Sequence, residues 1–131
     1  MYKTLFKTER LQIIHDYENA YLIDKFGNQI MEDEFYGDPE CGLIGPNNDW
    51  AIIAGEHITV WKKGLNEKLR NDDLKWIHSL RLKNNHLVEI LIDPWNKFSA
   101  IWQLNIQTME YVKIKDFTKY RTSEFCENVE W

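Results

Sequence analysis

The amino-acid sequence predicts an all-β fold, with a β-rich α+β fold as the alternative. Apolar and polar residues alternate along most of the chain, a period typical of strands with one buried face. Gly, Pro and Asn residues interrupt this alternation at nearly regular intervals. Six Trp, six Tyr and six Phe residues supply large rings for a core. We therefore expect an antiparallel sandwich or barrel of about ten short strands with one or two short helices.

Strand patterns in the first half of the chain are separated by clear turn signals. A turn at Phe26–Asn28 follows the third alternating segment. A short apolar run then precedes Gly55-Glu56, which predicts a hairpin with a two-residue connection. The strands expected in this half are 2–8, 10–14, 20–24, 50–54 and 57–62.

A second hairpin is predicted in the C-terminal half. Its connection is Asn84-Asn85, a residue pair well suited to positive φ. Pro94 and Asn96 then turn the chain into a further pair of strands. The strands expected in this half are 76–82, 86–92, 98–104 and 109–114.

Helices are expected to be a minor component. The polar stretch 65–75 and the segment 122–130 are the most plausible positions for them. The tail 117–131 is mixed in composition and predicts either a helix or a final strand. In the α+β alternative, residues 28–40 form a helix, although this stretch lacks a convincing apolar stripe.

Two segments of the chain echo one another. Residues 43–54 align without gaps to residues 91–102, with Leu, Ile, Pro and Asn recurring in place and Trp50 corresponding to Phe98. Fewer than three copies of this 48-residue period fit in the chain, too few for a closed propeller. We expect two similar strand–turn–strand units in one sheet system, with Trp50 and Phe98 in equivalent buried settings.

Size and cysteine content favour a single cytoplasmic domain. A chain of 131 residues is expected to form one domain over 1–131. Its apolar runs are far shorter than a membrane span, and no signal-peptide pattern opens the sequence. Cys41 and Cys126 lack zinc-type spacing. They predict two reduced thiols, with a single disulfide between them as the alternative.

No pattern of nucleophile, base or metal ligands is recognisable, so we expect no enzymatic activity, no metal and no cofactor. Serines occupy no nucleophile-elbow context, and no glycine-rich phosphate loop is present. The neighbours Glu56-His57 should point to opposite faces of a strand. Acidic residues around Cys41 should raise its thiol pKa. Surface or core roles are expected for the histidines, which are His15, His57, His78 and His86.

Charge is unevenly distributed along the chain. Residues 1–60 contain eleven acidic and four basic residues, a net charge of −7, whereas residues 61–131 carry +2. Residues 15–56 alone carry −9, with Lys25 as the single basic residue. This sign excludes nucleic acid as a ligand of the acidic region. Such a region is either a solvated face that aids solubility or a surface for a ligand of opposite charge. That ligand is a basic protein or a divalent cation, of which the cation is the weaker alternative because no D-x-D-x-D-G loop is present.

A family resemblance points in the same direction. The segment 36–61, with its Gly37-Asp38-Pro39, Gly42-Leu43-Ile44, Trp50 and Gly55-Glu56, resembles a segment of small bacterial proteins similar to the immunity proteins of contact-dependent inhibition and related polymorphic toxin systems. The resemblance implies a cytoplasmic, non-enzymatic inhibitor that binds one toxin domain. It identifies no particular functional residue.

The leading hypothesis is therefore an inhibitory protein that binds a cognate, basic toxin domain, such as a nuclease, through its acidic region. Electrostatic attraction would speed association, and aromatic side chains would supply affinity. No nucleic-acid or membrane partner is expected. The alternative is a β-barrel small-ligand-binding protein or hydrolase with an aromatic-lined cavity. The residues expected to bind the partner are Asp16, Glu18, Asp24, Glu32, Asp33, Glu34, Asp38 and Glu40.

Overall fold

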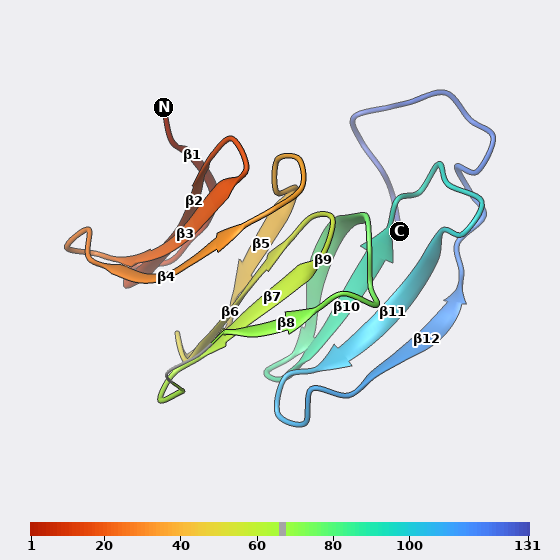
Figure 1. Ribbon diagram of the computed structural model, residues 1–131. Helices are drawn as coiled ribbons and strands as arrows, with labels where there is room; N and C mark the ends of the chain where they lie inside the picture. The colour runs from red at the N-terminus through yellow and green to blue at the C-terminus, as the bar shows by residue number, and fades with distance from the viewer. Residues whose placement is uncertain (66–67) are drawn as a thin grey trace.

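The computed structural model describes residues 1–65 and 68–131, which form twelve strands in three antiparallel four-stranded sheets (Figure 1). In each sheet the strands follow one another in sequence order. The N-terminal sheet contains β1 (Lys3–Lys7), β2 (Leu11–Asp16), β3 (Asn19–Asp24) and β4 (Gln29–Glu34). The central sheet contains β5 (Cys41–Ile44), β6 (Trp50–Ala54), β7 (Ile58–Lys62) and β8 (Leu69–Asn71). The C-terminal sheet contains β9 (Ile77–Asn84), β10 (Leu87–Ile92), β11 (Ala100–Asn105) and β12 (Tyr111–Asp116).

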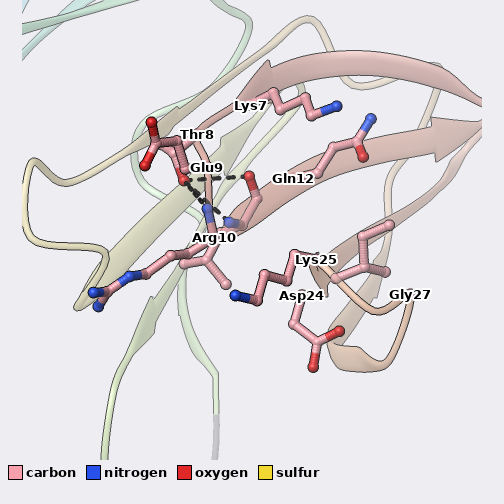
Figure 2. A pocket seen from close by; sticks show the side chains of 10 residues that line it. Lys7, Thr8, Glu9, Arg10, Gln12, Asp24, Lys25 and Gly27 are labelled. Atoms are coloured by element: carbon pink, nitrogen blue, oxygen red, sulfur yellow. Dashed lines mark hydrogen bonds between the residues drawn. The ribbon is translucent and has the colours of Figure 1, made fainter.

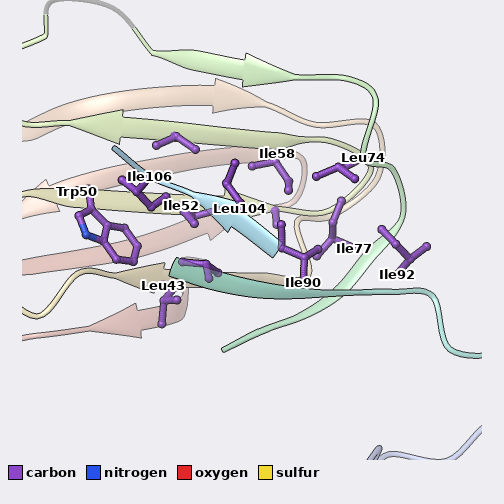
Figure 3. Close-up of a cluster of buried hydrophobic side chains, with 13 residues drawn as sticks. Leu43, Trp50, Ile52, Ile58, Leu74, Ile77, Ile90, Ile92, Leu104 and Ile106 are labelled. Carbon is purple, nitrogen blue, oxygen red and sulfur yellow. The ribbon is translucent and has the colours of Figure 1, made fainter. Parts of the chain in front are cut away.

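The central sheet is packed on both of its faces. Every residue of β6 is buried, and the side chains alternate between two hydrophobic clusters. Trp50 and Ile52 pack toward the C-terminal sheet, in the cluster drawn in Figure 3. Ala51 and Ile53 pack toward the N-terminal sheet. The uninterrupted apolar run of β6 is thus explained by a strand that is covered on both faces.

The connections between strands gather at two ends of the stack. Five of them lie at the upper end in Figure 1, joining β2–β3, β4–β5, β6–β7, β8–β9 and β10–β11, and the C-terminal tail lies there too. Backbone hydrogen bonds connect the β6–β7 connection to the start of the C-terminal sheet, from Ile77 N to Gly55 O at 2.8 Å and from Trp76 N to Glu56 O at 3.3 Å. The remaining connections lie at the opposite end of the strands, with the β3–β4 turn at the far left of Figure 1, and we call this the lower end. The upper end brings loops from all three sheets into one region.

The sandwich prediction is confirmed, and the barrel is wrong because each described sheet keeps two edge strands. No described residue is helical, so the helices expected over 65–75 and 122–130, and the alternative helix over 28–40, are wrong. The range 65–75 contains strand β8, although its residues 66–67 lie outside the described residues. The range 28–40 contains strand β4. Among the described residues, no helix is long and apolar enough to cross a membrane.

The C-terminal tail is neither the helix nor the strand that composition suggested. It runs as turns and irregular chain over the outer face of the C-terminal sheet. Phe117 packs there against Leu91 and Ile101, with Val129 and Trp131 beside it. The Arg81 guanidinium lies 4.0 Å from the centre of the Trp131 ring. Apolar residues at this irregular spacing suit neither a helical stripe nor an alternating strand.

The repeat prediction is partly wrong. Both echoing segments are strand–turn–strand as expected, but Trp50 is 5% exposed and Phe98 is 72% exposed. The reason is that β6 begins at Trp50, whereas β11 begins two residues after Phe98. Asn48, in the turn between β5 and β6, has a positive φ of 56°, which asparagine tolerates well. Asn96 has no positive φ, and its side chain accepts a hydrogen bond from Phe98 N at 2.8 Å instead.

Both predicted hairpins form, but their connections differ from expectation. The first has three residues, 55–57, rather than the two residues Gly55-Glu56, and the second is Asn85-His86 rather than Asn84-Asn85. Neither asparagine has a positive φ. The side-chain oxygen of Asn84 accepts hydrogen bonds from His86 N at 3.1 Å and Leu87 N at 3.0 Å. This is an asparagine turn held through the side chain rather than through a left-handed backbone.

Candidate functional site

The eight acidic residues expected to bind a partner do not form one surface. Five are exposed, Asp16 and Asp24 are partly buried, and Asp33 is buried. Asp24 lies at the lower end, where its carboxylate holds the β3–β4 turn. The other exposed and partly buried members lie on the outer face of the N-terminal sheet or on the connections of the upper end. These are Asp16, Glu18, Glu32, Glu34, Asp38 and Glu40.

The outer face of the N-terminal sheet combines acidic and apolar side chains. Strand register places Ile14, Tyr21 and Glu32 in one row across β2, β3 and β4. The next row holds Asp16 and Glu34 on either side of Asn19. Directly opposite residues of an antiparallel sheet share a face, so these side chains all point away from the central sheet. We call this surface the acidic–aromatic face.

Aromatic side chains occupy the middle of the acidic–aromatic face. Tyr2 and Tyr21 pack edge to face, with ring centroids 5.9 Å apart. Partial desolvation, together with the nearby Tyr2, Glu32 and Asp16, raises the pKa of Tyr21. The electrostatic influence of both acids on this phenol agrees with the shared face that the strand register gives. The carboxylates of Glu32 and Asp16 therefore lie close to the Tyr21 ring.

The apolar members of this face were absent from the expected partner-binding residues. They are Tyr2, Ile14, Tyr21 and Ile23. Alternation could have identified Ile14, Tyr21 and Ile23. Ile13 and Leu22 are the inward-facing residues of β2 and β3, so their sequence neighbours must face outward. An apolar residue on the opposite parity of an outer strand is a signal for a contact surface.

Asp33 is not a surface residue but the centre of a buried polar cluster between the N-terminal and central sheets. Its side chain points inward like those of Met31 on the same strand and Phe35 directly after the strand. The carboxylate lies 2.7 Å from His57 Nε2, accepts a hydrogen bond from the Thr59 hydroxyl, and lies 3.0 Å from Lys68 Nζ. The expectation that Asp33 contacts a partner is therefore at odds with its position.

His57 is fully buried in the same cluster. Its ring stacks on Phe35, with centroids 4.1 Å apart and planes 6° from parallel. Glu56 Oε2 lies 3.5 Å from His57 Nδ1, so the two side chains meet, contrary to expectation. The reason is that both residues belong to the β6–β7 connection rather than to an extended strand. Since His57 is 0% exposed, this histidine–carboxylate pair holds two sheets together and does not face solvent.

The ionisation of Asp33 follows from this environment. Burial raises its pKa, but hydrogen bonds from Thr59, His57 and Lys68 together outweigh burial, so the pKa lies below the ordinary aspartate value. The charged form is thus the one that the fold stabilises. Buried charges are tolerated when they are paired and hydrogen-bonded in this way.

A pocket of about 310 Å³ lies at the lower end of the N-terminal sheet (Figure 2). It carries Lys7, Arg10 and Lys25 beside Glu9 and Asp24. Two of its polar residues hold the local turns. The Thr8 hydroxyl accepts hydrogen bonds from two backbone amides of the β1–β2 turn, and Asp24 accepts two in the β3–β4 turn. These two side chains are therefore engaged in the turns that line the pocket.

The surroundings of Cys41 disfavour its thiolate form. Burial, and secondly the charge of Glu40, raise the pKa of the Cys41 thiol, as the acidic neighbours predicted. Cys41 and Cys126 are both free thiols. No cluster of three or more potential metal ligands occurs within residues 1–65 and 68–131.

The chain matches no protein-family model and no curated protein sequence.

Proposed function

We propose that this protein is a cytoplasmic inhibitor that binds and neutralises a basic toxin domain, in the manner of an immunity protein. The observation that carries the proposal is the acidic–aromatic face, on which Asp16, Glu32 and Glu34 lie beside Tyr21 and Ile14. This face lies on the outside of the stack and is not covered by any other described element. We propose no catalytic role for any residue.

The composition of the face suits protein recognition. Aromatic rings supply contact area at a low cost in side-chain entropy and are frequent among residues that dominate binding energy. Carboxylates at the rim attract a basic partner and accelerate its association. Tyr2 is exposed and already packed against Tyr21, so two rings are available together. The arrangement places apolar and acidic side chains next to one another on one face.

The upper end extends the acidic surface beyond the sheet. Glu18, on the β2–β3 turn, accepts a hydrogen bond from Gly37 N at 3.1 Å, which joins the face to the β4–β5 connection. Asp38 and Glu40 are exposed on that connection. A basic partner seated on the acidic–aromatic face would therefore meet further negative charge at the upper end.

Charge reversal on the acidic–aromatic face tests the proposal. The variant Glu32→Lys/Glu34→Lys should associate about tenfold more slowly with the toxin-domain product of the neighbouring reading frame at low salt. Its thermal stability should change little, because both side chains are exposed. Stopped-flow association rates measured at low and physiological ionic strength, together with survival of cells that express the toxin, provide the readout.

A matched variant makes the same charge change elsewhere. Asp49→Lys/Glu110→Lys reverses two exposed acids at the lower end, and it should associate nearly as fast as the wild type. If both variants slow association equally, net charge alone is responsible and the acidic–aromatic face is not the docking surface. If neither affects binding or protection, this acidic region serves only solubility.

A further inference from the structure

A second pocket, of about 370 Å³, lies at the upper end and is formed by loops of all three sheets and the tail. It contains residues of the β4–β5, β6–β7, β8–β9 and β10–β11 connections and of the segment 125–127. Two aromatic groups line it. Tyr36 and Trp76 pack edge to face with centroids 6.5 Å apart, and Trp95 packs against Phe125 at 5.0 Å. We call it the upper pocket.

The charge of the upper pocket is strongly negative. No lysine or arginine lines it, and five carboxylates do: Asp38, Glu40, Glu56, Asp93 and Glu127. One of these carboxylates is paired with a basic residue outside the lining: Lys75 Nζ lies 3.5 Å from Glu56 Oε1. His78 also lines the pocket, and burial lowers its pKa, while Glu40 and Asp93 act in the opposite direction. Burial thus disfavours a positive charge on the one basic side chain of the lining.

The backbone of Trp76 shows that the pocket wall is held in place. Trp76 has a φ of 58°, a strained value for a bulky residue that surrounding structure must enforce. Its N–H donates to Glu56 O at 3.3 Å, and its carbonyl accepts from Asp93 N at 2.8 Å. The strained residue is thereby clamped between two other connections. Its indole remains 51% exposed, available to a ligand at the pocket.

We propose that the upper pocket binds an organic cation, a guanidinium or alkylammonium group. Aromatic faces attract such cations through their quadrupole, and carboxylates supply hydrogen-bond acceptors and charge. The pocket also contains a hydrogen-bond donor, the Trp95 indole Nε1–H, which is buried and has no hydrogen-bond partner within the described part of the chain. A carbonyl of a peptide ligand would be its natural acceptor.

The source of the cation follows from the proposed function. The β4–β5 connection lines the upper pocket and is hydrogen-bonded to Glu18 beside the acidic–aromatic face. A basic partner on that face can place an arginine or lysine side chain in the pocket. This assignment of the source rests on the proposed function, whereas the cation specificity rests on the pocket lining alone.

Titration of the isolated protein tests the cation specificity. With N-acetyl-arginine amide, the indole N–H signals of Trp76 and Trp95 in ¹H–¹⁵N NMR spectra should shift saturably, with a dissociation constant of about 1 mM. N-acetyl-citrulline amide has nearly the same shape without the charge, and it should bind at least about tenfold more weakly. Equal binding of the two amides, or no saturable shift with the arginine amide, overturns the proposal.

Variants locate the binding within the upper pocket. Trp76→Ala, followed through the Trp95 signal, and Asp38→Asn should each weaken arginine-amide binding about tenfold. Phe98→Ala and Asp49→Asn remove an exposed ring and an exposed charge outside the pocket and should leave binding unchanged. Equal effects of pocket variants and controls contradict the assignment.

A second titration distinguishes the sources of the cation. In the complex with the toxin-domain product of the neighbouring reading frame, the arginine amide should no longer shift the Trp95 signal, because a partner side chain fills the pocket. An unchanged titration in the complex overturns the partner side chain as ligand and identifies a free cation. If no complex forms, the proposed function fails, while the titration of the isolated protein still decides whether the pocket binds cations.

Discussion

Replacing Asp33 with alanine should lower the free energy of unfolding by about 3–5 kcal/mol. The substitution removes the acceptor shared by Thr59, His57 and Lys68 and leaves two of these groups buried without their partner. Leaving a buried polar group without a partner costs more free energy than a typical hydrogen bond contributes to stability. Chemical denaturation monitored by tryptophan fluorescence measures the change. Glu34→Ala, one residue along the strand and exposed, should change stability by less than about 0.5 kcal/mol.

The pH dependence of stability provides an independent check on Asp33. Its pKa in the folded state lies below the ordinary value near 4, so the folded state favours the charged form relative to the unfolded state. The stabilisation is therefore complete above the unfolded-state pKa and is lost as pH falls through the folded-state pKa. The difference between wild type and Asp33→Ala should narrow below about pH 4. A difference that stays constant down to pH 2 would mean that the carboxylate charge is not what holds the cluster.

The second large effect is expected at Trp50. Trp50→Ala should cost about 3–5 kcal/mol, because the ring is buried between the central and C-terminal sheets. Its Nε1–H also donates to Asn85 O at 3.2 Å, which ties β6 to the β9–β10 connection. Phe98→Ala, the corresponding change in the echoing segment, should change stability by less than about 0.5 kcal/mol. Equal costs at the two positions would restore the equivalence that the sequence predicted.

Gly45 offers a coupled measurement of the same packing. A Cβ added at Gly45 would lie closer to Trp50 Nε1 than van der Waals contact allows. Gly45→Ala should therefore destabilise the wild type and cost less in the Trp50→Ala background. Additive costs would show that the ring and this glycine do not share space.

Alternation predicted strands well wherever a buried face is apolar. The strand from Trp50 to Ala54 is recognisable because all of its residues are apolar and buried, and the hairpin that follows it is recognisable because buried apolar residues recur at every second position. β4 was not assigned, since its sequence from Gln29 to Glu34 is mostly polar and only Met31 and Asp33 point inward. β8 is three residues long, too short for a periodic signal.

The candidate surface was identified by charge, and the error at Asp33 shows the limit of that approach. Glu32, Asp33 and Glu34 contribute equally to a charge count, although strand parity sends the middle residue inward and its neighbours outward. The apolar alignment of Met31, Asp33 and Phe35 on one parity contains this information. Partners of Asp33 lie about 24 to 35 residues away in sequence, and only the stacking of two sheets brings them together.

Hydrogen–deuterium exchange of the protein, alone and in complex with the toxin-domain product of the neighbouring reading frame, tests most directly whether the acidic–aromatic face is the docking surface. Added protection should appear in β4 (Gln29–Glu34), an edge strand that exchanges readily when uncovered, in the β2–β3 turn at Tyr17, and in the connection 35–40. Protection in β12 (Tyr111–Asp116), the edge of the C-terminal sheet, should not change. Added protection confined to β12 and the tail, with β4 and residues 35–40 unaffected, would contradict the account.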